Sequence, residues 1–192
     1  MNHQLHARVG ASCGVLFSVL LFVGADAKLQ WLAIAGLVLF IPFLAYLYSI
    51  LRAAEGPGGW LAPTAFAAGL CGITLKIVSD VPERAVRHVE AGTPLEKAIN
   101  DLADGAFIIA LTPLAIFTAA VAAVAIQTGA LPRWLGVGAA VTSVALAING
   151  AFFDSSFGPA FLLLLAWTFA TSIVLVRAAP AESERLAHAY SL

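Results

Sequence analysis

The sequence predicts an all-α integral membrane protein, a polytopic transmembrane bundle of about six helices. Hydrophobic residues make up 61% of the 192 residues, only 11% are charged, and the mean hydropathy is +0.94. Soluble domains average about 45–50% apolar and roughly 25% charged residues. A soluble fold of this size could not bury so much apolar surface, so water-soluble globular and disordered classes are excluded. A span needs about 20 apolar residues, which leaves no room for a separate soluble domain.

Six apolar stretches, separated by helix-breaking residues, are the candidate spans of a single integral membrane domain over residues 1–192. Between the second and third stretches lie residues 55–59 (Glu-Gly-Pro-Gly-Gly), where glycine and proline are expected to end a helix. Helices are required because unpaired backbone groups are costly in hydrocarbon. The candidate spans cover residues 9–25, 29–52, 61–79, 98–127, 134–153 and 158–177.

The first stretch has a second interpretation. A weakly basic start with His3, His6 and Arg8, a short apolar run, and Ala-Asp-Ala at residues 25–27 resemble a secretory signal peptide with its cleavage site. Another hydrophobic stretch follows within a few residues, which favours a retained helical hairpin. Cleavage would remove one helix and leave the other five oriented as before.

Small residues predict close helix packing in two places. Gly10 and Gly14 form a GxxxG pattern, and residues 119–125 are mostly alanine. Such faces let helices approach closely, and we expect both to pack within one chain rather than between chains.

Basic residues in short loops set the orientation of a membrane protein. With the N-terminus in the cytoplasm, the two sides carry five basic residues each, so the count alone decides nothing. Trp60 and Trp134 begin the third and fifth stretches on the same side, as interfacial anchors do. Four of the five inside residues also flank a span directly: Arg8, Arg52, Arg133 and Arg177. We therefore expect a multi-pass protein with both termini in the cytoplasm.

Nine of the 21 charged residues (ten basic plus eleven acidic) lie between residues 80 and 104, so polar chemistry is expected there. The outer loop over residues 80–96 should contain a short amphipathic surface helix that ends near Gly92. Thr93 and Glu96 then match a capping box, with Pro94 at the first helical position. The fourth helix should therefore begin about three turns before its apolar part.

Polar residues from three stretches fall at the same outer level and form a candidate ligand-binding site. One interpretation is a solvated cap, in which Lys76 reaches the interface and pairs with Asp80 one helical turn away. The other is a pocket, because ionisable residues at membrane depth are costly and often functional. The residues of this layer are Lys76, Asp80, Asn100, Asp101, Asp104, Asn149 and Asp154.

Within such a pocket the candidate catalytic groups are three carboxylates, Asp104, Asp154 and Asp80, with Lys76 balancing their charge. Trp167 lies in the middle of the sixth stretch, too deep for an interfacial anchor. It belongs either to the core or to the wall of an apolar ligand cavity, and it completes the set of candidate ligand-binding residues.

No metal site, cofactor or nucleic-acid partner is predicted. The net charge is −1 and no long basic run is present. P-loop and HExxH motifs are also absent from the sequence. Both cysteines lie in apolar stretches and the histidines are scattered without metal-ligand spacing: Cys13, Cys71, His3, His6, His88 and His188.

The sequence Leu-Pro-Arg-Trp-Leu-Gly at residues 131–136 follows an alanine-rich stretch. Together with the composition and the six spans, it resembles a group of small actinobacterial membrane proteins classed as domains of unknown function. The resemblance implies a six-helix protein of the bacterial plasma (inner) membrane, and it brings no catalytic residues.

We therefore expect an accessory or small-molecule-binding helical bundle with a polar, acidic site at its outer face. Its expected partners are the lipid bilayer and a lipophilic small molecule. One alternative is an intramembrane enzyme that acts on a lipophilic substrate with an aspartate as general acid or base. Another is a small proton- or cation-coupled transporter, which would need a continuous polar path through the spans. The sequence leaves open whether the protein is an enzyme, and it leaves the oligomeric state open.

Overall fold

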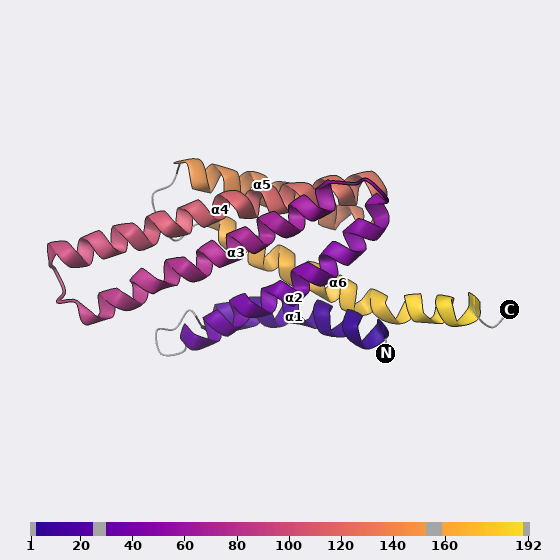
Figure 1. Cartoon of the computed structure of the whole chain (residues 1–192), viewed down its shortest axis with the longest axis horizontal. Helices are drawn as coiled ribbons and strands as arrows, with labels where there is room; N and C mark the ends of the chain where they lie inside the picture. The colour runs from indigo at the N-terminus through magenta and orange to yellow at the C-terminus, as the bar shows by residue number, and fades with distance from the viewer. Residues whose placement is uncertain (1–2, 25–29, 153–158, 190–192) are drawn as a thin grey trace. The chain divides into compact units, whose positions relative to one another are not determined.

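A computed structural model describes residues 3–24, 30–152 and 159–189 of the chain (Figure 1). All regular structure in these residues is helical, which confirms the predicted all-α fold class. The elements are α1 (His3–Val23), α2 (Gln30–Glu55), α3 (Leu61–Ala85), the short 3-10 helix η1 (Val86–His88), α4 (Pro94–Thr128), α5 (Arg133–Phe152) and α6 (Pro159–Ala189).

Five of these helices, α2 to α6, are long and apolar enough to cross a membrane. The α1 helix contributes a shorter apolar segment, Arg8–Val23. Its length and composition therefore do not establish the first predicted span. The proposed cleavage site at residues 25–27 lies outside the described residues.

The chain folds as two compact units. We call Met1–Ile50 with Leu165–Leu192 the terminal unit, and Leu51–Leu164 the central unit. The central unit therefore contains α3, α4 and α5, together with the end of α2 and the first residues of α6.

In the terminal unit, small residues of α1 lie directly against α2 and α6. A Cβ added to Gly10 would lie 2.6 Å from the Cβ of Tyr46, and one added to Gly14 would lie 2.0 Å from Ser172 Oγ. Both distances are below 3.0 Å, so a side chain at either position would displace a neighbouring residue. The GxxxG pattern thus packs within the chain, as the sequence predicts. Phe17 extends the same contact, with its ring centroid 4.6 Å from that of α2 residue Phe40.

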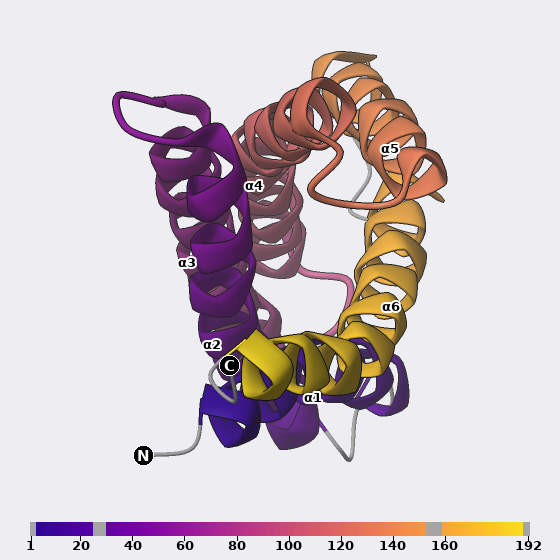
Figure 2. The same cartoon turned by 90° about the vertical axis from the view of Figure 1, so that its right-hand side faces the viewer.

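In the central unit, α4 lies between α3 and α5 (Figures 1 and 2). Gly72 of α3 faces α4, and a Cβ there would lie 2.6 Å from Leu114 Cγ. On the other side, Ser143 of α5 donates a hydrogen bond to the carbonyl of Ala115, at 2.8 Å. An interhelical hydrogen bond of this kind stabilises helix association in hydrocarbon. Both α3 and α5 therefore pack against α4.

The glycine-rich connector between α2 and α3 is held by hydrogen bonds rather than left open. The carboxylate of Glu55 accepts from the backbone N–H groups of Leu61 and Ala62, each at 2.8 Å. Arg52 Nη1 donates to the carbonyl of Gly59 at 2.6 Å. The last residue of α2 thereby satisfies donors at the first turn of α3, where a negative charge also complements the helix dipole.

The segment expected to form a separate surface helix within residues 80–96 does not do so. Instead α3 continues through Pro82 to Ala85, and only the 3-10 turn Val86–His88 follows. Proline removes one backbone donor and crowds the preceding turn, but it need not end a helix whose other bonds persist.

Candidate functional site

An ion pair lies on α3, near the end of the helix's apolar part. The Nζ atom of Lys76 pairs with Oδ1 of Asp80 one helical turn later. Ser79 contributes two contacts: its hydroxyl lies 3.4 Å from Lys76 Nζ and donates to the Lys76 carbonyl at 2.7 Å. The two charged side chains are only 11% and 7% exposed, so the pair is largely withdrawn from solvent.

One aromatic ring of α4 lies against this pair within the central unit, and a ring of α6 packs on that ring. Lys76 Nζ lies 5.2 Å from the centroid of the Phe107 ring of α4, a cation–π contact. Phe107 in turn packs edge-to-face against Phe161, in the first turn of α6, with 5.4 Å between ring centroids. Both rings are buried. The ammonium group thus has a carboxylate on one side and an aromatic wall on another.

Asn149 of α5 is another buried polar group of the central unit. Its side chain is 3% exposed, and its Nδ2 has no hydrogen-bond partner. A Cβ on the next residue, Gly150, would lie 3.8 Å from the carbonyl oxygen of Ile108, which adjoins Phe107. Asn149 therefore lies on α5 at the level of the α4 turn that carries Phe107. A buried amide donor without a partner costs free energy unless something accepts its hydrogen bond.

The remaining predicted residues divide into three groups. Asp104 lies on α4 one turn before Phe107 and is half-buried, whereas Asn100 and Asp101 are exposed. Trp167 is buried at 5% exposure, but it belongs to the terminal unit. Asp154 lies outside the described residues. Of the predicted layer, the structure therefore joins Lys76 to Asp80 and leaves Asn100 and Asp101 on the surface.

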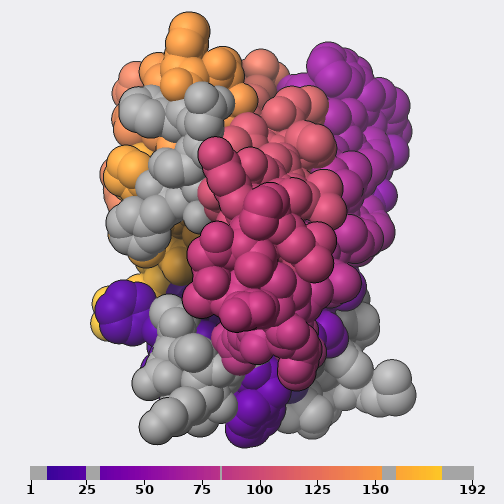
Figure 3. Space-filling model, turned by 90° about the vertical axis from the view of Figure 1, so that its left-hand side faces the viewer, coloured from indigo at the N-terminus to yellow at the C-terminus, as the bar shows by residue number. Residues whose placement is uncertain are grey.

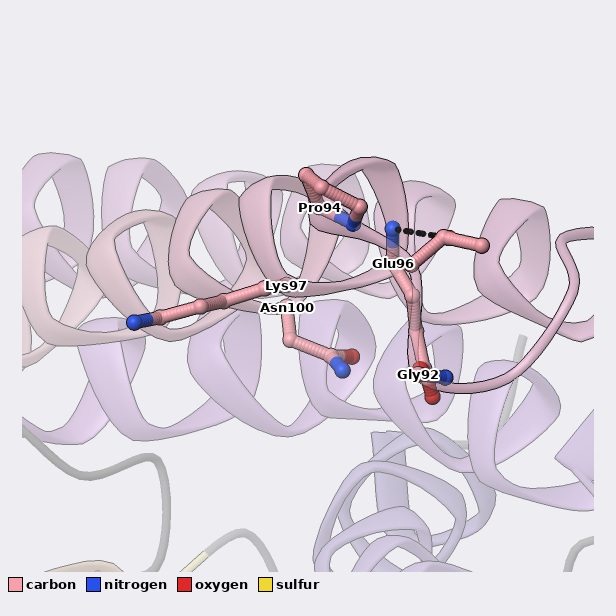
Figure 4. Close-up of a pocket in the computed structure, with 6 residues that line it drawn as sticks. Gly92, Pro94, Glu96, Lys97 and Asn100 are labelled. Atoms are coloured by element: carbon pink, nitrogen blue, oxygen red, sulfur yellow. Dashed lines mark hydrogen bonds between the residues drawn. The ribbon is translucent and has the colours of Figure 1, made fainter.

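Asn100 lines a pocket of about 550 Å³ at the start of α4, on the end of the central unit that faces the viewer in Figure 3. Figure 4 shows its lining, in which Glu96 belongs to the predicted capping box and Lys97 and Asn100 do not. Thr93 Oγ1 accepts from the N–H of Glu96 at 3.2 Å. The Glu96 carboxylate accepts from the N–H of Gly92 at 2.6 Å, one residue earlier than the usual motif. The pocket is thus explained by a helix start and does not identify a ligand.

Three residues of the candidate site were not predicted from the sequence: Ser79, Phe107 and Phe161. Ser79 lies three residues after Lys76, and residues at this spacing share a helix face, so the contact between them could have been predicted from the sequence. The contact between Phe107 and Phe161 joins residues of two helices far apart in the sequence. No local spacing rule predicts such a contact, because it depends on how the helices pack.

By helix length and hydropathy, the chain is a multi-pass helical membrane protein. No protein-family model matches its sequence, and no significant match occurs among curated proteins or solved structures. The resemblance to small actinobacterial membrane proteins stays a prediction. Within the described ranges, no cluster of three or more His, Cys, Asp or Glu side chains is placed to hold a metal ion.

Proposed function

We propose that this membrane protein binds a small amphiphilic molecule in its central unit, beside Phe107. The observation that carries the proposal is the buried pair of Lys76 and Asp80. Replacing a buried ion pair by well-packed apolar residues is often neutral or stabilising, so stability alone is a weak reason to hold one in a span. An ionisable side chain in a membrane-spanning helix supports the hypothesis of a functional site. A role in ligand binding would explain why the protein tolerates the free-energy cost of burying the two charges.

The donors of the site favour a ligand with an acidic head group. Lys76 can exchange its bond to Asp80 for a bond to a ligand oxygen, because an ammonium group has three donors. The Nδ2 of Asn149 offers another donor that has no partner in the protein. Phe107 and Phe161 supply an apolar wall for the ligand's hydrocarbon part. A fatty acid has both features and reaches the site from the bilayer.

The proposed orientation puts both termini in the cytoplasm and this site near the outer surface of a bacterial plasma membrane. The arginines that flank the predicted inner ends of the spans support it. Cysteine accessibility tests it directly: a cysteine placed at Glu90, which is exposed, should react with a membrane-impermeant maleimide added to intact cells. One placed at Ala130 should react only after lysis. The reverse pattern would invert the topology.

Photolabelling tests the binding site. The purified protein in nanodiscs is exposed to a diazirine-bearing fatty acid, irradiated, and its labelled peptides are identified by mass spectrometry. We expect labelling near Phe107 that excess oleate suppresses. The double variant K76M/D80L removes both charges without leaving one unpaired, so it should fold and yet lose labelling by about tenfold or more, the value of a charge-assisted hydrogen bond.

Two further variants separate binding from folding. D80N removes the internal competitor for Lys76 but leaves this lysine without its buried partner, so its labelling is measured per folded molecule, where it should be kept or increased. K97M removes an exposed lysine of α4 and should leave the labelling unchanged. Equal labelling of the wild type and K76M/D80L, or labelling spread evenly over all lipid-facing helices, would overturn the proposal.

A further inference from the structure

An open groove of about 350 Å³ lies between α1 and α6 in the terminal unit. Its lining is apolar along most of its length, and one charged side chain borders it. A groove of this character in a membrane protein faces acyl chains, but apolar character alone does not select a ligand. The lining residues are Ser12, Val15, Leu16, Ile173, Val176 and Arg177.

The two helices run antiparallel along this groove. Gly14 of α1 faces Ser172 of α6, and one turn later Ser18 Oγ donates to the carbonyl of Leu165 at 3.2 Å. Higher residue numbers on α1 therefore lie opposite lower numbers on α6. Arg177 consequently lies opposite the part of α1 that precedes Ser12.

A second arginine lies at that same end. Arg8 is exposed and precedes Ser12 by four residues, which places the two on the same face of α1. Arg177, on the facing helix, is exposed as well. The groove thus has an apolar length with Arg177 at one end, and Arg8 lies on α1 one helical turn beyond Ser12, toward the same end. Guanidinium groups bind phosphate oxygens in a bidentate manner, and basic pockets between membrane helices recognise lipid head groups.

We propose that this groove binds one anionic phospholipid, with an acyl chain along Val15, Leu16 and Ile173 and the phosphate at Arg8 and Arg177. The occupant is a lipid rather than free phosphate because the groove supplies apolar surface that only an acyl chain can cover. The groove lies in the terminal unit and involves none of the residues of the proposed fatty-acid site. The two proposals can therefore fail separately.

Lipid retention tests the groove. The protein is reconstituted in nanodiscs with equal amounts of phosphatidylglycerol and phosphatidylcholine, and the lipids that stay bound are counted by native mass spectrometry. We expect the wild type to retain phosphatidylglycerol over phosphatidylcholine by about tenfold or more. The double variant R8Q/R177Q should retain the two lipids about equally. Equal retention by the wild type would overturn the proposal.

Two controls separate the groove from general attraction to a negative surface. Arg133 is also exposed and begins a membrane-spanning helix, but it belongs to the central unit. R133Q should leave lipid selectivity unchanged, and a loss equal to that of R8Q/R177Q would contradict a specific site. V176W fills the groove without changing charge and should also reduce phosphatidylglycerol retention. Unchanged retention in a folded V176W protein, verified by circular dichroism, would show that the groove is not involved.

Discussion

Gly59 lies directly against the carboxylate of Glu55: a Cβ at residue 59 would be 2.2 Å from Glu55 Cδ. The same carboxylate accepts the N–H groups of Leu61 and Ala62. The Glu55 carboxylate can therefore cap α3 only because residue 59 has no side chain in its place. A methyl group there must displace Glu55 from the first turn of α3.

The first prediction follows from this contact. We expect G59A to lower the midpoint of thermal unfolding in detergent by a few degrees, because the α3 donors lose their acceptor. The matched control is G105A: nothing lies within 4 Å of a Cβ at Gly105, in the interior of α4. Alanine is a better helix former than glycine, so G105A should raise the midpoint. Equal shifts in both variants would show that Glu55 does not hold the connector.

The close approach of α1 to its neighbours gives a second prediction. A Cβ at Gly14 would lie 2.0 Å from Ser172 Oγ and 2.6 Å from Phe43 Cδ2. G14A should therefore destabilise the protein by about 1–3 kcal/mol, the usual cost of overpacking. Since S172A removes one of the clashing atoms, G14A/S172A should lose less than the sum of the two single variants. Strict additivity in denaturant titrations would refute the contact.

Charge pairing on α3 gives a third prediction. K76M leaves the Asp80 carboxylate buried without its partner, which typically costs about 3–5 kcal/mol. K76M/D80L removes both charges and should regain most of that stability. Unfolding titrations of the wild type and both variants measure the difference. If the double variant is as unstable as K76M, the attraction between Lys76 and Asp80 stabilises the protein by more than the desolvation of the two charges destabilises it.

Two buried hydroxyl groups provide a fourth prediction, because removing one should lower the stability of the protein and removing the other should not. Ser18 Oγ donates across helices to the carbonyl of Leu165, whereas Thr171 Oγ1 is fully buried with no partner. S18A should lower stability by about 0.6 kcal/mol, typical of such bonds in membranes. T171V keeps the side-chain shape and removes an unpaired polar atom, so it should be neutral or stabilising. A clear loss of stability in T171V would indicate a hydrogen-bond partner for this hydroxyl.

The capping box supplies a fifth prediction. T93A removes the acceptor of the Glu96 N–H and should weaken the start of α4 by about 1 kcal/mol. Hydrogen exchange should accelerate in the first turn of α4 and stay unchanged near its middle. T74A is the control, because the Thr74 hydroxyl only donates back to its own helix, at the carbonyl of Leu70. Faster exchange throughout α4 in T93A would point to a global effect instead.

Features that depend on local spacing could be predicted from the sequence. The capping box joins Thr93 to Glu96 within one turn, and the pair of Lys76 and Asp80 joins two residues four apart. Helical geometry brings such residues together whatever the rest of the chain does. Five of the six predicted spans correspond to helices long and apolar enough to cross a membrane, since hydrocarbon dictates the length and composition of a span.

Features that depend on packing could not be predicted in this way. Phe107 covers Lys76 because α3 lies along α4 in one particular register, and the sequence of neither helix specifies that register. The helix α3 continues past Pro82 because proline removes one backbone donor and crowds the preceding turn without necessarily ending the helix. Whether the outer carboxylates converge stays a prediction for Asp154, which lies outside the described residues.

The buried pair on α3 has an electrical consequence. Its two charges are opposite and lie one helical turn apart, so together they carry no net charge. A membrane potential does work of about 2.3 kcal/mol per 100 mV on each elementary charge that crosses the whole bilayer. Movement of α3 with the pair intact would transport no net charge and should produce no gating current from these residues. The membrane potential therefore does almost no net work on the pair of Lys76 and Asp80 when α3 moves.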